Sequence, residues 1–350
     1  MNRRTFLNVV VSTLTLLPTA IAGVAQDARP TSRPLDSTTL PAPPPFVEGS
    51  FTLVVLPDTQ NYAESFPDLL EQQTRWIAEH RTDRNIAFVI TLGDLTNRNT
   101  TDQWENVRRA FRHLDGVVPY VLVTGNHDYG NLGNTDSRET GLNTVFSEGD
   151  FFQRPTFGGL FGPRLDNTYH LFTAGGRDWL VLALEWGPRH MVLHWADMIL
   201  DQYPERHAIV VTHAYLYSDN TRYDHVSRPE QRWNPHSYPS AKLPEGTNDG
   251  EAIWTKLIAP HDNVDFVLSG HVLNTGTGRL SSTNPHGHVV HQIMANYQER
   301  PRGGEGYLRL MEFPPDVAAV QVKTYSPVLD RYLTDPTQQF VLELPRSNRR

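Results

Sequence analysis

Carboxylate, amide and imidazole side chains stand directly after five apolar stretches of this chain. They belong to the strings Asp58-Thr59-Gln60, Gly93-Asp94, Gly125-Asn126-His127-Asp128, Thr212-His213 and Gly270-His271. Side chains of these types hold divalent metal ions in proteins. The chain has no cysteine, so a metal site in it has only nitrogen and oxygen donors. A metal centre is the leading interpretation of the five strings.

The five apolar stretches are expected to be strands that bring these side chains together. Their ranges are Phe51–Leu56, 86–92, 120–124, 208–211 and 264–268. Helical spacing of apolar residues over 66–80 and 101–114 places helices between the first three strands. This alternation indicates a mainly parallel sheet. Because ligands bind in the crevice at the carboxyl ends of such strands, we expect the five strings to converge.

The second half of the chain predicts a further set of strands between long polar segments. Strands at 167–172 and 179–185 have the pattern of a β-hairpin, and helices are expected at 190–202 and 251–257. Strands near 289–293, 307–313 and 318–324 close the domain. The segments 129–166 and 215–247 are long, rich in polar and aromatic residues, and more typical of functional loops than of spacers. We expect two sheets with helices outside.

The order of the five strings resembles that of the calcineurin-like metallophosphoesterases, over residues 51–324. The resemblance implies an α/β fold of four layers, α/β/β/α, in which two mixed sheets are flanked by helices. It also implies two divalent metal ions. Asp94 would bridge the ions, and the other ligands would be Asp58 and Gln60 at the first ion and Asn126, His213 and His271 at the second. His127 would act on the leaving group, and Asp128 would orient and polarise His127.

Physical chemistry explains why these residue types suit that reaction. A carboxylate bridge holds two cations roughly 3.5–4 Å apart, where they promote in-line phosphoryl displacement by a bound hydroxide. Phosphoryl transfer depends on positioning and charge neutralisation. A histidine poised as an acid typically adds about 10²–10⁴-fold in rate. The expected function is therefore hydrolysis of small phosphate mono- or diesters, with the ester type left open.

One departure from the family pattern concerns the first metal ion. Many members have a second histidine in the last motif, where this chain has Leu273, and Gln60 also stands in a place that is often histidine. The remaining oxygen donors favour Mg²⁺, Mn²⁺, Ca²⁺ or iron, whereas the two histidines of the second site suit Zn²⁺, Mn²⁺ or Fe²⁺. Asn97 or Asn274 is a candidate substitute ligand. We expect a weaker first site, with a one-metal centre as the alternative.

Several other residues have both a functional and a structural interpretation. Taken singly, Asp94 is a candidate helix cap, Asn126 and Asp128 are candidate turn residues, and His213 and His271 are candidate core histidines. Arg98 is the leading candidate for phosphate binding, and Arg222, Tyr223, His225 and Arg228 are weaker ones. His286, His288 and His291 are considered as a rival metal site or as part of the active-site rim.

The amino terminus indicates where the protein is located, and the composition limits the classes of partner that it binds. Arg3-Arg4-Thr5-Phe6-Leu7 and a short apolar run over 9–17 indicate a twin-arginine (Tat) signal over 1–25, and hence a periplasmic or extracellular protein. A proline-rich linker is expected at 26–47 and one domain at 48–345. The net charge of −8 argues against nucleic-acid binding, and no later stretch reaches transmembrane length. The oligomeric state is left open.

Two non-enzymatic alternatives stand beside the phosphoesterase. Leu273 and Gln60 motivate a binding protein that keeps the fold and a metal but turns over weakly or not at all. The intact Asn126-His127-Asp128 set argues against it, since a binding module needs no acid. The proline-rich segment motivates a tethered surface protein.

Overall fold

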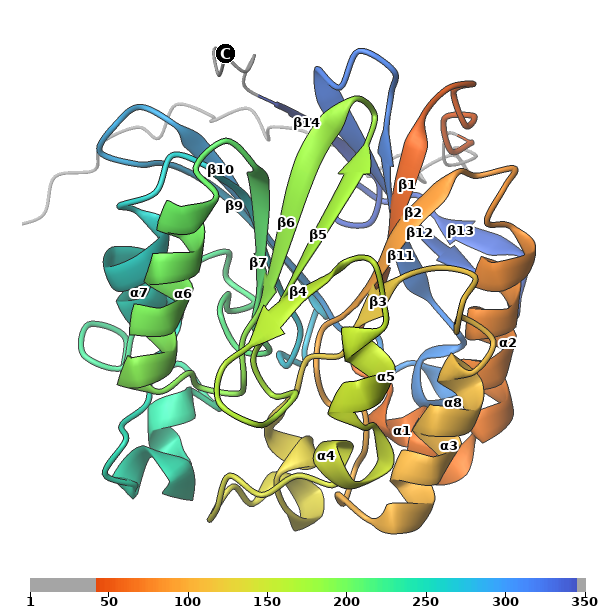
Figure 1. Ribbon diagram of the computed structural model, residues 1–350. Coiled ribbons are helices and arrows are strands. Elements are labelled where there is room, and N and C mark those ends of the chain that lie inside the picture. Colours follow the sequence, from red (N-terminus) through yellow and green to blue (C-terminus); the bar gives the residue numbers. More distant parts are fainter. Residues whose placement is uncertain (1–41, 345–350) are drawn as a thin grey trace, which may run out of the picture. The chain divides into compact units, whose positions relative to one another are not determined.

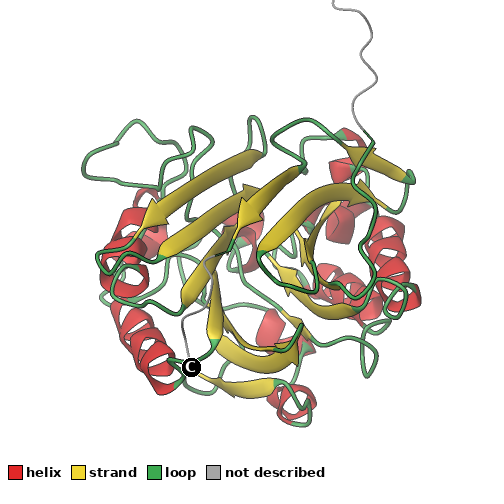
Figure 2. Ribbon diagram, turned by 90° about the horizontal axis from the view of Figure 1, so that it is seen from above, coloured by secondary structure: helices red, strands yellow, loops and turns green. Residues whose placement is uncertain are grey.

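The computed structural model describes residues 42–344, which form two β-sheets that pack between helices (Figure 1). Seen from above in Figure 2, the strands lie in the middle and helices lie outside them. The predicted four-layer α/β/β/α arrangement is confirmed. The signal peptide predicted for 1–25, and residues 26–41 of the predicted linker, lie outside the described residues.

The first sheet contains the strands that precede Asp58, Asp94 and Asn126. Its order is β13-β12-β11-β1-β2-β3, and β14 pairs with β12. β1 is parallel to β2, and β2 to β3, as predicted. The strands are β1 (Phe51–Leu56), β2 (Ile86–Thr91), β3 (Tyr120–Val121), β11 (Leu308–Phe313), β12 (Ala319–Ser326), β13 (Arg331–Leu333) and β14 (Phe340–Glu343). β3 is shorter than the predicted 120–124, and β13 and β14 were not predicted.

The second sheet contains the strands that precede His213 and His271. Its order is β4-β5-β6-β7-β8-β10-β9, with β6, β7, β8 and β10 parallel. The predicted hairpin is present as antiparallel β5 and β6. The strands are β4 (Phe157–Leu160), β5 (Thr168–Ala174), β6 (Arg177–Ala183), β7 (His207–Val211), β8 (Val264–Ser269), β9 (Thr277–Thr283) and β10 (Val289–Ala295). β4 and β9 were missed.

Helices cover the outer face of each sheet (Figure 1). Beside the first sheet are α1 (Gln60–Ser65), α2 (Pro67–Glu79) and α3 (Thr101–Phe111). Beside the second are α6 (His190–Gln202) and α7 (Gly250–Ile253), which continues as a π-helical turn over Trp254–Ile258. Short helices lie in the connections: α4 (Leu142–Val145), α5 (Glu148–Phe152) and α8 (Pro301–Gly304). Within residues 42–344, no helix is both long and apolar enough to cross a lipid bilayer.

Three apolar cores separate the four layers. Alternation along β1 sends Leu53 and Val55 toward the second sheet and Val54 and Leu56 toward the helices. The apolar stripe of α6 closes the third core against β6, β7 and β8. Because both faces of these strands are buried, the segments at their carboxyl ends start from rigid positions.

Candidate metal centre

Three of the predicted ligands meet at the carboxyl ends of strands from both sheets. Asp94, His213 and His271 are all buried, and each offers a ligand atom within 4.8 Å of the others. Nε2 of His213 lies 3.1 Å from Oδ2 of Asp94 and 3.2 Å from Nδ1 of His271. Side chains that are far apart in the sequence therefore share one small volume, as the strand-end argument predicted.

Backbone carbonyls determine which ring nitrogens face this volume. Nδ1 of His213 lies 2.7 Å from the carbonyl oxygen of Leu92, and Nε2 of His271 lies 2.9 Å from that of Trp233. A carbonyl only accepts, so these nitrogens carry the protons. In the neutral rings, the opposite nitrogens then hold lone pairs and converge with Oδ2 of Asp94. This is the orientation that outer partners impose on metal-binding histidines.

Asp58 lies beside this cluster and is held from two sides. Its Oδ2 accepts hydrogen bonds from the backbone N–H of His271 at 3.0 Å and from Nδ2 of Asn296 at 2.8 Å. Asn296 follows β10 and belongs to none of the five strings, so sequence analysis missed it. Burial, together with the Asp94 carboxylate, raises the pKa of Asp58 well above its usual range, against the opposing effect of His213.

The charges in the cluster depend strongly on one another. Burial disfavours the carboxylate of Asp94, but His213 and His127 outweigh burial and hold the pKa of Asp94 well below its usual range. Burial likewise opposes a charged His213, yet Asp94 and Asp58 raise its pKa to about 9. Burial and His213 lower the pKa of His271 to about 3. The cluster thus attracts one positive charge, and a proton and a metal ion compete for it.

Two buried amide oxygens support a metal ion rather than a proton alone. Within the described part of the chain, Oε1 of Gln60 and Oδ1 of Asn126 have no hydrogen-bond partner, although Nε2 of Gln60 donates to Oδ2 of Asp94 at 3.1 Å. An unpaired buried oxygen is costly, and a cation satisfies it. The residues present therefore fit divalent metal ions with nitrogen and oxygen ligands.

Backbone conformation is unusual at the candidate ligands. Asp58, Asp94 and His271 have positive φ angles of 21°, 50° and 74°. Such conformations are unfavourable outside glycine and cluster at functional sites. At Gly93, φ is 97° and an added Cβ would lie 2.5 Å from Nδ1 of His213. Glycine at this position lets the β2 turn approach the imidazole ring.

His127 and Asp128 are placed differently from each other. The backbone N–H of His127 donates to Oδ1 of Asp94 at 2.9 Å, and its Nδ1 lies 3.0 Å from the carbonyl oxygen of Asn97. The carboxylate of Asp128 instead accepts the backbone N–H groups of Gly125, Leu95 and Thr96 and the Thr96 hydroxyl, at 2.8–3.0 Å.

This hydrogen bonding corrects one expectation. The carbonyl of Asn97, not the carboxylate of Asp128, is the group that orients His127. Residues 126–128 form a tight 3₁₀ turn, which points the Asp128 side chain back at backbone N–H groups. Asp128 thereby ties the turn that carries Asn126 to the turn that carries Asp94.

The remaining candidates near the centre make other contacts. Nε of Arg98 donates to Glu64 at 2.5 Å, so this exposed guanidinium is engaged beside the predicted phosphate site. Nδ2 of Asn97 donates to Glu64 at 2.6 Å and Nδ2 of Asn274 to Ser218 at 3.4 Å. These contacts engage the amide nitrogens, whereas the amide oxygens are the atoms that would bind a metal ion.

The rival histidines lie elsewhere. Nε2 of His288 pairs with Asp265 at 3.0 Å, near the amino end of β8, whereas His271 follows the carboxyl end of that strand. His291 contacts Ser281 and the carbonyl of Glu343. The alternative that these histidines line the active-site rim is wrong: β10 runs parallel to β8, His286 and His288 precede β10, and His291 is its third residue, so they lie toward the amino ends of these strands.

The weaker substrate candidates after β7 also have partners inside the protein. Tyr223 is buried, Arg222 pairs with Glu251, and His225 lies against Asp249. Arg228 lies 4.0 Å from Asp219.

Comparison with known sequences agrees with the geometry. Residues 51–274 match the family described as calcineurin-like phosphoesterase. The chain is 30% identical over 290 residues to the uncharacterized protein YvnB of Bacillus subtilis, covering 81% of this chain and 20% of YvnB. It is 29% identical over 138 residues to a rat protein named serine/threonine-protein phosphatase CPPED1, covering 37% of this chain and 40% of that protein. The chain thus spans about a fifth and two fifths of these relatives' lengths.

One solved structure supports the fold, and a second is reported beside it. A purple acid phosphatase, PPD1, from yellow lupin seeds has a TM-score of 0.50 and 15% identity, over 86% of this chain and 55% of that one. A dimetal phosphatase from Danio rerio has a TM-score of 0.49 and 13% identity, over 84% of this chain and 98% of that one.

Proposed function

Because the chain belongs to the calcineurin-like phosphoesterase family, we propose that it hydrolyses small phosphate esters at the cluster around Asp94. The observation that carries the proposal is the convergence of Asp94, His213 and His271 in one buried volume. The carboxylate and the two imidazoles attract one positive charge, and a metal ion competes for that place with the proton on His213. Both mono- and diesters are in the proposed range.

The family resemblance supports the proposed ligand sets. Asp94, Asn126, His213 and His271 would hold one ion, and Asp58, Gln60 and Asp94 would hold the other. When bound, such ions supply an activated water and neutralise charge on the phosphate. The site near Asp58 has no imidazole, which favours Mg²⁺, Mn²⁺, Ca²⁺ or iron and makes it the weaker of the two.

His127 is the proposed acid. Its Nδ1 lies against the carbonyl of Asn97, which fixes the proton there and leaves Nε2 as the other acid–base nitrogen of the ring. The backbone N–H of His127 bonds Asp94, so the ring is tied to the metal cluster. From this position His127 delivers a proton to the departing alkoxide oxygen. Asn126, beside it, is the proposed substrate contact together with Arg98.

The proposed location is the periplasm or the cell exterior. Support comes from the sequence alone: Arg3-Arg4 followed by Phe6-Leu7, an apolar run over 9–17 and small residues up to position 25. Twin-arginine export carries folded proteins, which suits a protein that acquires its metal ions first. A fusion of residues 1–30 to a reporter, compared with an Arg3→Lys/Arg4→Lys version, tests this step.

An assay of the purified protein tests the activity. p-Nitrophenyl phosphate and its bis ester are offered with Mn²⁺, Mg²⁺ or Zn²⁺, with and without a chelator. We expect metal-dependent hydrolysis that Asp94→Asn abolishes and that the exposed control His286→Ala retains. Activity that survives chelation contradicts the metal mechanism. No activity on any ester with any of these metals contradicts the proposal and favours the metal-binding protein without turnover.

A further inference from the structure

A second group of metal-type ligands lies in the long segment between β7 and α7. It consists of His225, His236 and Asp249, whose ligand atoms lie within 4.8 Å of one another. None of the three belongs to the cluster around Asp94. Sequence analysis considered His225 only as a substrate contact, and it did not single out His236 or Asp249.

The distances within this group suit a single metal ion. Nδ1 of His225 lies 2.9 Å from Oδ2 of Asp249, and Nε2 of His236 lies 4.0 Å from the same oxygen. At a tetrahedral ion with metal–ligand bonds of about 2.0–2.1 Å, two ligand atoms lie roughly 3.4 Å apart. The shorter of the two distances is a hydrogen bond that an ion would replace, and the longer one closes when the side chain of His236 rotates, so the three atoms can come to share one ion.

His236 provides the observation that points to a ligand. Its Nε2 is buried, although the side chain is 26% exposed, and has no hydrogen-bond partner among residues 42–344. The ring stacks face to face on that of His225, with centroids 3.5 Å apart and planes at 20°, and both rings lie next to the carboxylate of Asp249. A neutral imidazole is the form that binds metal ions.

Asp249 is held in place for this role. Its Oδ2 accepts the backbone N–H of His225 at 2.8 Å and Nδ2 of Asn234 at 3.1 Å, and its Oδ1 caps α7 through the N–H of Ala252 at 3.2 Å. Hydrogen-bonded carboxylates of this kind are typical metal ligands, because the outer partners fix their orientation. The carboxylate is 2% exposed, whereas the His225 side chain is 43% exposed and leaves a way in for an ion.

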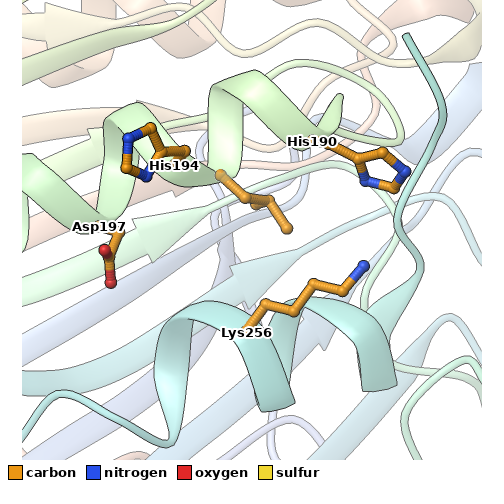
Figure 3. A pocket seen from close by; sticks show the side chains of 5 residues that line it. His190, His194, Asp197 and Lys256 are labelled. Atoms are coloured by element: carbon orange, nitrogen blue, oxygen red, sulfur yellow. The ribbon is translucent and has the colours of Figure 1, made fainter. Parts of the chain in front are cut away.

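A groove with polar side chains of its own lies beside this group. It has a volume of about 390 Å³ and is lined by His190, Leu193, His194, Asp197 and Lys256 (Figure 3). Figure 3 shows His194 and Asp197 at the end away from His190 and Lys256. His190 and Lys256 both contact Asn248, at 3.1 and 2.6 Å. The Lys256 ammonium thus bonds the amide next to Asp249, and the Asp249 carboxylate remains with the two imidazoles.

We propose that His225, His236 and Asp249 form a further metal site that takes one transition-metal ion of the zinc class, with water completing its coordination. Two imidazoles and one carboxylate are a donor set that suits this class. The ion joins three points of the segment between β7 and α7. Trp233, whose carbonyl fixes the ring of His271, lies within that segment and has a positive φ of 62°. The site therefore stabilises the segment that orients His271.

Zinc stoichiometry of the full-length protein tests this proposal. Zn²⁺ alone is titrated in competition with a chromophoric chelator, and bound zinc is measured by elemental analysis. We expect His225→Ala/His236→Ala to bind one equivalent fewer than the parent protein. The matched control, His194→Ala/His286→Ala, replaces two exposed histidines and should bind as much as the parent. Equal zinc content in the double variant and the parent overturns the proposal.

The same comparison in an Asp94→Ala background separates this site from the proposed catalytic centre. There, the one-equivalent loss on replacing His225 and His236 should persist, whether or not the protein hydrolyses esters. His236→Gln, checked for native circular dichroism, serves if the double variant does not fold. An anomalous scattering peak at the zinc edge between His225 and His236 is expected in crystals. Crystals loaded with zinc that show no peak there contradict the site.

Discussion

His213 and His271 face each other across 3.2 Å, from Nε2 to Nδ1, and a backbone carbonyl holds the other nitrogen of each ring. The two carbonyls belong to Leu92, after β2 in the first sheet, and to Trp233, in the segment after β7. Two distant segments of the chain therefore orient the two imidazole rings, so that the lone pairs of His213 Nε2 and His271 Nδ1 face each other. The pair is preorganised for a cation before any cation binds.

Replacing one ring of this pair should weaken metal binding. His271→Ala removes a ligand atom, so the affinity loss should exceed the roughly 10–100-fold that is typical of losing an outer partner. Competition with a chelator measures it, and His286→Ala, an exposed histidine, is the control. Unchanged affinity in His271→Ala would show that this ring does not bind the ion.

Replacing His127 should affect turnover according to the leaving group, if the proposed function is right. His127→Ala should lower kcat by about 10²–10⁴-fold for phenyl phosphate, whose leaving group needs a proton. The loss should be smaller for p-nitrophenyl phosphate, whose leaving group departs readily as an anion. The metal content should stay that of the parent protein. An equal loss for both esters would exclude the acid role.

Asp128→Asn should destabilise the protein, because the carboxylate accepts four hydrogen bonds within the core. An amide replaces one acceptor by a donor that faces N–H groups. Since hydrogen bonds to charged groups contribute about 1.5–3 kcal/mol each, we expect a loss of about 2–4 kcal/mol. Urea unfolding measures it, with the exposed Asp136→Asn as control. A shifted pH–rate profile with unchanged stability would instead restore the role of orienting His127.

His170 should make the free energy of unfolding depend on pH below neutrality. It lies among Phe88, Phe151 and Phe157, and burial together with Arg154 lowers its pKa from 6.5 to about 3. The unfolded chain therefore takes up the proton first. The contribution of neutral His170 to the free energy of unfolding is complete above pH 6.5 and is lost as the pH falls toward 3. At pH 5 this loss amounts to about 2 kcal/mol.

Unfolding in urea at pH 7.5 and pH 5, with chelator present, measures this effect. His170→Phe should lose less stability between the two pH values than the parent protein does. The exposed His286→Gln should behave like the parent. If His170→Phe loses as much as the parent, the acid sensitivity arises elsewhere.

Strong local signals explain the elements that were predicted well. The helix at 190–202 and the strand Phe51–Leu56 have the predicted bounds, because the helix carries a clear helical period and the strand is a nearly continuous apolar run that Pro57 follows. β4 contains Gly158 and Gly159 and β9 is largely polar at exposed positions, so neither shows a period of its own. Their partners, β5 and β10, supply the pairing that makes them strands.

The amino-acid sequence by itself determined the class of fold, the family and five strand-end strings, because apolar periodicity and short motifs are local properties of the chain. Only the tertiary structure decided that Asn296 holds Asp58, that Asp128 bonds backbone instead of His127, and that His225, His236 and Asp249 meet. Those contacts join residues whose separation along the chain carries no regular spacing. They depend on how the two sheets and the loop after β7 pack, and packing is a property of the folded chain as a whole.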